Sequence, residues 1–456
     1  MDRYGFHDPT RAPDPVLWEE LARPLPAWFA DAKLGILIHW GAYSLPAWAE
    51  PIGELGRVDE RQWFGHNPYA EWYWNTIRFE ASPARQHHRE VYGDAAYDDF
   101  LDDWVADAFD PAAWVDLFVR CGARYIIPTT KHHDGITLWN APGTGTRNTV
   151  FRGPRRDLIR DLESEVRRAG LRFGVYYSGG LDWSVTDLPA HDLIDGMDAF
   201  VSVRNRRPQD AGYAAYAYLH VRDLIDRYHP DVIWNDIEWP DEGKHAGSLG
   251  LLELFRYFYA EVPDGVVNDR WGDTHSDFRT SEYHAHTELE KGGAWENCRG
   301  IGMSFGYNQV EDEHHLLSAD RLCRHFVDVV SRGGNLLLNV GPDARGTIPA
   351  KQQAVLVQLG AWMEIAGRAI HGSRPLDTGV GRASEEPWVR WTSTEGHAWA
   401  FVQAVGPVQL EVDLDRVDVA TADGRALPVT ADGATLTVDP PALSPGLPRL
   451  VRWNMW

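Results

Sequence analysis

The sequence is poor in cysteine, has no long apolar run and carries less positive than negative charge. Its three cysteines in 456 residues are widely spaced, which indicates neither a disulfide framework nor a CxxC metal site. The sequence contains no run of about 18 apolar residues, the length needed to span a membrane. Its N-terminal segment also lacks the apolar core of a secretory signal. We therefore expect a cytoplasmic protein.

The charge balance argues against two classes of partner. Lys and Arg number 44 against 67 Asp and Glu, a formal net charge of −23. Clustered Lys and Arg bind nucleic acid and anionic lipid, so we expect neither a nucleic-acid nor a membrane partner. The oligomeric state stays open, a homo-oligomer included. The 21 tryptophans offer flat faces of the kind that pack on sugar rings, although most are expected to fill the core.

From about residue 110 to 370, apolar segments alternate with amphipathic ones, which predicts strands of a parallel sheet joined by crossover helices. The length and the polar strand ends favour a (β/α)8-like, TIM-type α/β barrel over an open doubly wound sheet. No glycine-rich dinucleotide fingerprint follows a strand. Six or seven strands are recognisable, so we predict an imperfect catalytic barrel over residues 1–370. The clearest strands are 34–40, 124–133, 173–179, 230–236, 266–270 and 335–340.

The pattern changes after residue 370. Residues 371–456 alternate apolar and polar side chains with a period of two, which is typical of strands with one buried face. We predict a small C-terminal antiparallel β-sandwich that packs on the barrel. No residue in this segment suggests catalysis.

One strand end is the strongest candidate for chemistry. PDVIWNDIEW (230–239) begins with apolar β-branched residues and turns polar at Asn235 and Asp236. In a barrel of parallel strands, active sites form at this end. Apolar walls raise the pKa of a carboxyl group, so an ionised Asp236 needs hydrogen bonds or a positive charge nearby, which histidines and Arg270 can supply. We predict that Asp236 is a catalytic carboxylate.

Other strand ends and adjoining loops also carry unusual polar residues. Taken alone, His39 would more often be a core residue, and Glu71 or Glu282 a solvated acid. His132 and His133 lack further ligands at a recognisable spacing, so we expect no metal and interpret both as hydrogen-bond donors to hydroxyl groups. Together they supply two acids, neutral donors and aromatic plates, which matches glycoside hydrolysis. The set is His39, Glu71, Trp72, His132, His133, Tyr177, Asp236, Arg270 and Glu282.

Seven segments carry a family resemblance. They are WFADAKLGILIHWGAYSLPAW (28–48), NPYAEWY (67–73), YIIPTTKHHDGITLW (125–139), GVYYSGGLDW (174–183), PDVIWNDIEWP (230–240), SFGYN (304–308) and GGNLLLNVGP (333–342). In this order they resemble the α-L-fucosidases of glycoside hydrolase family 29, through almost the whole predicted barrel. The resemblance implies an exo-acting, retaining double displacement on fucosylated oligosaccharides or glycoconjugates, without a metal or organic cofactor.

The resemblance also implies residue roles. Asp236 matches the nucleophile of the family, and Glu238 is a weaker rival because only the aspartate fits the motif. The two carboxyl groups of a retaining enzyme lie about 5–5.5 Å apart. The implied sugar-binding residues are His39, Glu71, Trp72, His132, His133, Arg270, Tyr177 (or Tyr176 in its place), and Trp234 with Phe305 beside the C5 methyl group.

Two glutamates compete for the acid/base role. Glu282 matches a T-x-E-Y-H segment of one subgroup, and Glu296 matches a W-E segment of another. We favour Glu282, because it follows Arg270 closely and can end a strand of its own. The alternatives for the whole protein are a glycosidase acting on another 6-substituted L-sugar such as an α-L-galactoside, a non-catalytic fucose-binding protein, and a metal-dependent hydrolase.

Overall fold

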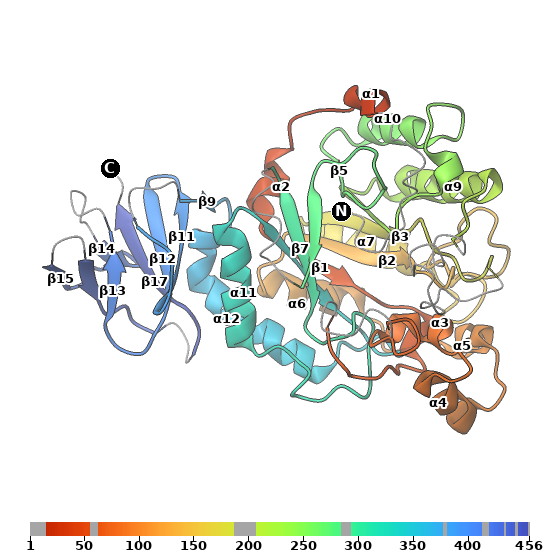
Figure 1. Cartoon of the computed structure of the whole chain (residues 1–456), viewed down its shortest axis with the longest axis horizontal. Helices are drawn as coiled ribbons and strands as arrows, with labels where there is room; N and C mark the ends of the chain where they lie inside the picture. Colours follow the sequence, from red (N-terminus) through yellow and green to blue (C-terminus); the bar gives the residue numbers. More distant parts are fainter. Residues whose placement is uncertain are drawn as a thin grey trace, which may run out of the picture.

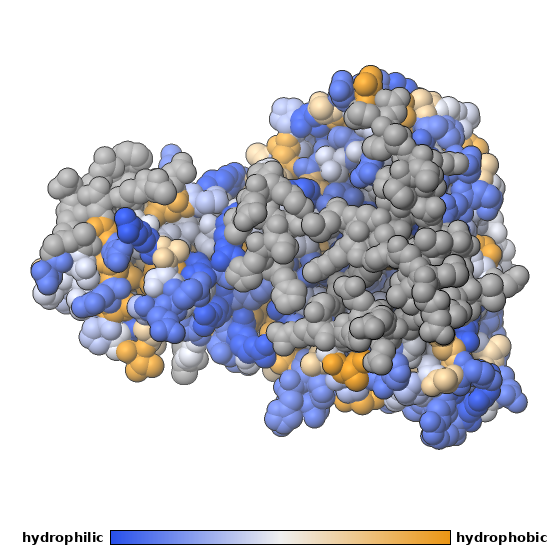
Figure 2. Space-filling model, viewed as in Figure 1, coloured by the Kyte–Doolittle hydropathy of each residue, from blue (hydrophilic) through white to orange (hydrophobic). Residues whose placement is uncertain are grey.

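The computed structural model describes residues 15–54, 63–186, 207–283, 293–376, 381–412, 419–432, 435–442 and 446–454. A parallel sheet wrapped in helices forms the larger part, and antiparallel strands form the smaller part (Figure 1). Among the coloured residues of the face drawn in Figure 2, apolar residues are scattered among hydrophilic ones. None of the described helices combines the length and the apolar character needed to cross a bilayer.

Eight parallel strands form a curled sheet in the order β5-β4-β3-β2-β1-β8-β7-β6, which confirms the predicted TIM-like architecture. Two more strands are present than the six clearest in the sequence. The additional strands, RTSE and WENCRG, contain no apolar run that could reveal them. The strands are β1 (Leu34–Ile38), β2 (Tyr125–Lys131), β3 (Arg172–Ser178), β4 (Val232–Asp236), β5 (Val266–Val267), β6 (Arg279–Glu282), β7 (Trp295–Gly300) and β8 (Asn335–Val340).

The barrel is imperfect between β5 and β6, which form the two edges of the sheet and share no strand pairing within the described residues. Asp277 lies between them. Its backbone N–H donates to the carbonyl of Val267 (2.9 Å), and its carboxylate accepts from the N–H of Val267 (2.8 Å). The ring of Phe278 packs on Phe29, with 4.4 Å between centroids. An irregular segment and an N-terminal helix therefore close the wall where strand pairing stops.

Helices cover the outside of the sheet, and their first turns are fixed by aspartates. The side chains of Asp110, Asp157 and Asp210 accept hydrogen bonds from the backbone at the starts of α6, α7 and α9. These helices are α6 (Pro111–Arg120), α7 (Leu158–Arg168), α9 (Ala211–Tyr228), α10 (Leu251–Glu261), α11 (Ala319–Ser331) and α12 (Ala350–Ile370), preceded by the N-terminal α1 (Pro15–Glu19) and α2 (Ala27–Ala32).

The long connection after β1 carries short helices rather than sheet. It brings aromatic and acidic side chains to the carboxyl end of the barrel, where the candidate site lies. Its elements, with one further turn after β4, are η1 (Ala42–Ser44), η2 (Ala70–Trp72), α3 (Tyr73–Thr76), α4 (Pro83–Tyr92), α5 (Tyr97–Asp103) and η3 (Asp241–Gly243).

Two antiparallel sheets follow α12 and share one apolar core, which gives the predicted β-sandwich. This part is fastened to the last helix of the barrel. Trp362 donates to the carbonyl of Pro448 (3.0 Å), and Thr392 donates to that of Ala369 (2.8 Å). The strands are β9 (Arg374–Pro375), β10 (Ser384–Glu385), β11 (Trp388–Thr394), β12 (His397–Gln403), β13 (Val408–Glu411), β14 (Val419–Thr421), β15 (Val429–Asp432), β16 (Thr435–Val438) and β17 (Arg449–Asn454).

Candidate active site

A pocket opens at the carboxyl ends of the barrel strands and gathers most of the residues singled out in the sequence. Tyr177 and Glu296 are not part of its wall. The predicted residues that line it are His39, Glu71, Trp72, His132, His133, Trp234, Asp236, Arg270, Glu282 and Phe305. The remaining wall consists of Leu37, Trp63, Phe64, Tyr69, Tyr176, Ile237 and Cys298.

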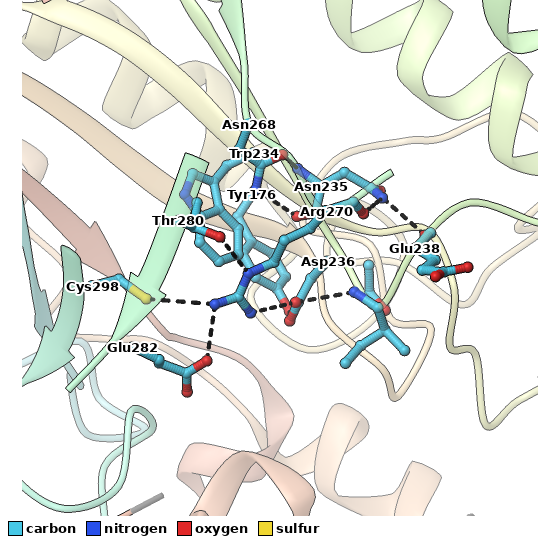
Figure 3. Close-up of polar contacts among 12 residues, drawn as sticks. Tyr176, Trp234, Asn235, Asp236, Glu238, Asn268, Arg270, Thr280, Glu282 and Cys298 are labelled. Carbon is cyan, nitrogen blue, oxygen red and sulfur yellow. Dashed lines mark hydrogen bonds and ion pairs between the residues drawn. The ribbon is translucent and has the colours of Figure 1, made fainter. Parts of the chain in front are cut away.

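Asp236 is the last residue of β4, and both of its carboxylate oxygens are hydrogen-bonded. Oδ1 accepts from Arg270 Nη1 (2.8 Å) and from the backbone N–H of Ile237 (3.0 Å), while Oδ2 accepts from the hydroxyl of Tyr176 (2.7 Å) (Figure 3). Burial by itself would raise the pKa of Asp236. The positive charge of Arg270 and the hydrogen bonds from Tyr176 and Arg270 outweigh burial and hold that pKa below its ordinary value. Asp236 is therefore an ionised carboxylate at neutral pH.

Arg270 links Asp236 to the second acid. Its Nη1 binds Asp236, and its Nη2 binds Glu282 Oε2 at 2.9 Å (Figure 3). The guanidinium lies 4.5 Å over the ring of Trp234, and its Nε donates to Thr280 Oγ1 (3.1 Å). Because one planar group contacts both acids, the two carboxyl groups are held at a short separation across it. Such a pair can divide the work of a nucleophile and a proton donor.

Tyr176, not Tyr177, belongs to the pocket, which corrects the preferred assignment. The hydroxyl of Tyr177 contacts His220 Nδ1 (3.1 Å), behind the sheet. Adjacent strand residues point to opposite faces, so only one of the two tyrosines can face the barrel interior. Tyr176 is that residue, and its ring stacks on Trp234 with 5.5 Å between centroids.

The substitution Tyr176→Phe is expected to move the acid limb of the kcat/KM profile to higher pH by about one unit, because a hydrogen bond to a charged group contributes about 1.5–3 kcal/mol. The variant loses the hydrogen-bond donor to Asp236 Oδ2, so the pKa of Asp236 rises. At a given acidic pH a larger fraction of Asp236 is then protonated and inactive. A pH–rate series on an aryl α-L-fucoside, the type of substrate that the family resemblance implies, measures the shift. Tyr177→Phe is the matched control and should leave the acid limb unmoved; equal shifts in both variants would contradict this role of Tyr176.

Two histidines of the pocket are neutral and have a defined tautomer. Burial lowers the pKa of His39 to about 4 and that of His133 to about 3. The hydroxyl of Ser178 donates to the carbonyl of Leu181 (2.8 Å), so it accepts from Nδ1–H of His133 (2.6 Å). Nε2 of His133, 3.9 Å from Asp236 Oδ2, is then an acceptor and not the predicted donor. A sugar hydroxyl would donate to it.

The same argument applies to His39. The amide nitrogen of Asn339 donates to the carbonyl of Phe305 (2.7 Å), so the amide oxygen accepts from Nδ1–H of His39 (2.7 Å). Nε2 of His39 carries no proton. Both imidazoles therefore offer acceptors to hydroxyl groups.

Glu296, the alternative to Glu282, is unsuited to the acid/base role. Its side chain lies inside the barrel beneath the pocket, where it accepts from Trp234 Nε1 (3.0 Å) and from the hydroxyl of Tyr125. Burial raises the pKa of Glu296 to about 7. It fixes the ring of Trp234 from below instead of meeting a leaving group. Glu238, the weaker rival for the nucleophile, is likewise outside the pocket wall and pairs with Lys244 (3.0 Å).

Several wall residues were not predicted from the sequence. Trp63 and Tyr69 pack edge to face, with centroids 5.2 Å apart, and the hydroxyl of Tyr69 lies 3.5 Å from Glu282 Oε1. The aromatic stretch around residues 67–75 was a signal for Tyr69, but composition does not say which rings face inward. In the described part of the chain, no three His, Cys, Asp or Glu side chains are grouped to hold a metal ion.

The chain is similar to known α-L-fucosidases over most of its length. The family model described as Alpha-L-fucosidase matches residues 12–368. The Alpha-L-fucosidase of Dictyostelium discoideum is 33% identical over 396 residues, 84% of this chain and 79% of that protein. Human tissue α-L-fucosidase is 33% identical over 369 residues, 78% of this chain and 72% of that protein.

Solved structures agree with these relatives. The crystal structure of Thermotoga maritima α-fucosidase has 42% sequence identity and a TM-score of 0.85, covering 96% of this chain and 99% of that one. A Thermotoga maritima α-L-fucosynthase, an aspartate-to-glycine variant in complex with a fucosyl-fucosyl azide, also has 42% identity and a TM-score of 0.85. It covers 94% of this chain and 96% of that one.

Proposed function

Because the chain belongs to the α-L-fucosidase family of glycoside hydrolases, family 29, we propose that it is an exo-acting α-L-fucosidase that retains the configuration of the anomeric carbon. The proposed reaction is a double displacement through a covalent fucosyl-enzyme. The observation that carries this proposal is the pair of acids, Asp236 and Glu282, on one guanidinium in one pocket. Close carboxyl pairs are the arrangement that retaining glycosidases use.

In the first step, Asp236 attacks the anomeric carbon while the bond to the leaving oxygen breaks, and Glu282 gives that oxygen its proton. In the second step, Glu282 takes a proton from water, and the resulting hydroxide displaces Asp236 from the sugar. Arg270 supports both steps. While Asp236 is an anion, Arg270 neutralises it; once Asp236 is an ester, the charge of Arg270 faces Glu282, which by then is the carboxylate.

The proposed substrate is a terminal α-L-fucoside of an oligosaccharide or glycoconjugate. Fucose differs from galactose by a methyl group where galactose has a hydroxymethyl group, and an apolar wall favours the methyl. Phe305 and Trp234 supply such a wall, and the ring of Phe305 lies 5.1 Å from that of His39. Glu71 and the acceptor nitrogens of His39 and His133 would bind the ring hydroxyls.

The first sugar released from an aryl α-L-fucoside is expected to be the α anomer of L-fucose, followed by slow conversion to the β anomer in water. A proton NMR time course distinguishes the two anomers. An aryl α-L-galactoside should turn over at least about tenfold more slowly, since pockets of this kind discriminate by about 10–200-fold. Initial release of the β anomer would overturn retention, faster galactoside turnover would overturn the substrate, and binding of fucose without any release would favour a binding protein.

A further inference from the structure

Phe305 is carried by a segment without regular structure, residues 301–311, called here the Phe305 loop. It follows β7 and places the ring of Phe305 against His39 and, with 5.3 Å between centroids, against Tyr69. The position of this ring sets the size of the pocket beside the sugar. The contacts that hold the loop therefore bear on substrate binding.

Two carboxyl groups hold the loop: the buried Glu71, from outside it, and the half-buried Glu311, at its own C-terminal end. Glu71 Oε2 accepts from the hydroxyl of Ser304 (3.1 Å) and the backbone N–H of Gly306 (2.7 Å). Glu311 Oε1 accepts from the backbone N–H of Ser304 (2.7 Å). Phe305 is thus flanked on both sides by residues bound to a carboxyl group. The carboxyl group of Glu311 packs tightly against the backbone of the loop, since a Cβ added to Gly302 would lie 2.1 Å from Glu311 Oε2.

The carboxyl groups of Glu282, Glu71 and Glu311 lie close enough for their negative charges to repel one another. Burial raises the pKa of Glu71 to about 7 and that of Glu311 to about 8; the charge of Glu71 further raises the pKa of Glu311, and that of Glu282 further raises the pKa of Glu71. The charge of Glu71 also acts on Tyr43 and Tyr283, whose pKa values are raised mainly by burial, so both tyrosines stay neutral. Near neutral pH, Glu71 and Glu311 together still bind at least one proton. At alkaline pH both are ionised, and two negative charges then lie close together where little water reaches them.

We propose that Glu311 is a positioning residue that, together with Glu71, fixes Ser304 and with it the ring of Phe305, so that the pocket closes on the sugar only while the two glutamates hold at least one proton between them. The inference rests on the proposed function for the identity of the sugar. When both groups are ionised, their repulsion and their need for water pull the Phe305 loop away from the sugar. The effect appears in sugar binding, because neither glutamate takes part in bond breaking.

The test is the dissociation constant of L-fucose, measured by titration calorimetry across the neutral and alkaline range. In the unaltered protein it should rise about tenfold between about pH 7 and pH 9, as the binding-competent fraction falls with the second ionisation. Glu311→Gln keeps the acceptor for Ser304 but cannot ionise, so its constant should change less than about twofold over the same range. Asp312→Asn, a matched change at the exposed neighbouring residue, should behave like the unaltered protein.

A purely structural role for Glu311 predicts a lower melting temperature without any change in pH dependence. Equal pH dependence in the unaltered protein and in Glu311→Gln would overturn the proposal, as would a constant that does not change with pH in the unaltered protein. Glu311→Ala adds a second readout: KM for an aryl α-L-fucoside should rise about fivefold at pH 7 while kcat stays within about twofold, because a lost hydrogen bond loosens the loop. Failure of the proposed function is distinct, since it would appear as fucose binding without hydrolysis.

Discussion

Replacing Asp236 with glycine is expected to lower kcat for an aryl α-L-fucoside by about 10⁴-fold or more, because the proposed nucleophile is gone. The glycine also leaves a space beside Arg270 Nη1, which keeps its positive charge. Azide, a small anion, fits that space and can attack the anomeric carbon from the side of Asp236. Turnover should then return in azide, with β-L-fucosyl azide as the product, measured by aryl release and NMR. The fucosynthase relative, an aspartate-to-glycine variant bound to a β-L-fucosyl azide unit, supports this expectation.

Glu238→Gln is the control for this experiment. Glu238 is two residues away, is also a carboxylate and pairs with Lys244 and Arg207 outside the pocket wall. Its variant should show turnover that does not depend on azide. Near wild-type activity in folded Asp236→Gly, verified by its melting curve, would show that the nucleophile is another residue.

Replacing Glu282 with alanine should give a loss that depends on the leaving group. For a fucosylated oligosaccharide, kcat/KM is expected to fall by about 10²–10⁴-fold, the usual contribution of a general acid. For a dinitrophenyl α-L-fucoside the first step should be nearly unaffected, because that leaving group departs without a proton. The fucosyl-enzyme then accumulates, and azide attacks it from the face opposite Asp236. The product should be α-L-fucosyl azide, the anomer opposite to the one from Asp236→Gly.

Because the two variants should form opposite anomers of fucosyl azide, the experiment tests the nucleophile role of Asp236 and the acid/base role of Glu282 separately. Glu296→Gln should form no fucosyl azide, since its side chain is enclosed between Tyr125 and Trp234 beneath the pocket. If Glu296→Gln formed the α-azide and Glu282→Ala did not, the acid/base role would pass to Glu296. If both Asp236→Gly and Glu282→Ala formed the same anomer, the division of roles would be wrong.

The sequence was sufficient to predict a strand and a site residue together where a reactive side chain ends a recognisable apolar run. Asp236 ends an apolar β-branched run, and such a run predicts both a buried strand and the place where it becomes polar. Strand β7 was missed, and β6 was anticipated only as a strand that Glu282 could end, because neither contains an apolar run. The burial of β7 comes from the barrel around it, not from its own composition. Pattern reading works one segment at a time, so it cannot find strands that are stabilised mainly by their neighbours.

The finer choices required the register of the strands. The pairing of β2 with β3 shifts in register between Thr129 and Lys131, so that Thr129 pairs with Tyr176 and Lys131 with Tyr177. On the other side of the barrel, Glu282 pairs with Cys298, whereas Glu296 pairs with Thr280, two positions earlier on β6. That offset places Glu282 at the rim and Glu296 below it. Neither fact can be obtained from the residues of a single strand.

The unpaired edges β5 and β6 have a further consequence. Arg270 follows β5 and Glu282 ends β6, so their ion pair crosses the place where the sheet has no strand pairing in the described residues, above the contact between Asp277 and Val267. The ion pair between Arg270 and Glu282 therefore links the two unpaired edges of the barrel with side chains of the candidate site. A substitution in this pair would act on fold integrity and on turnover together, which couples the evolution of one to that of the other.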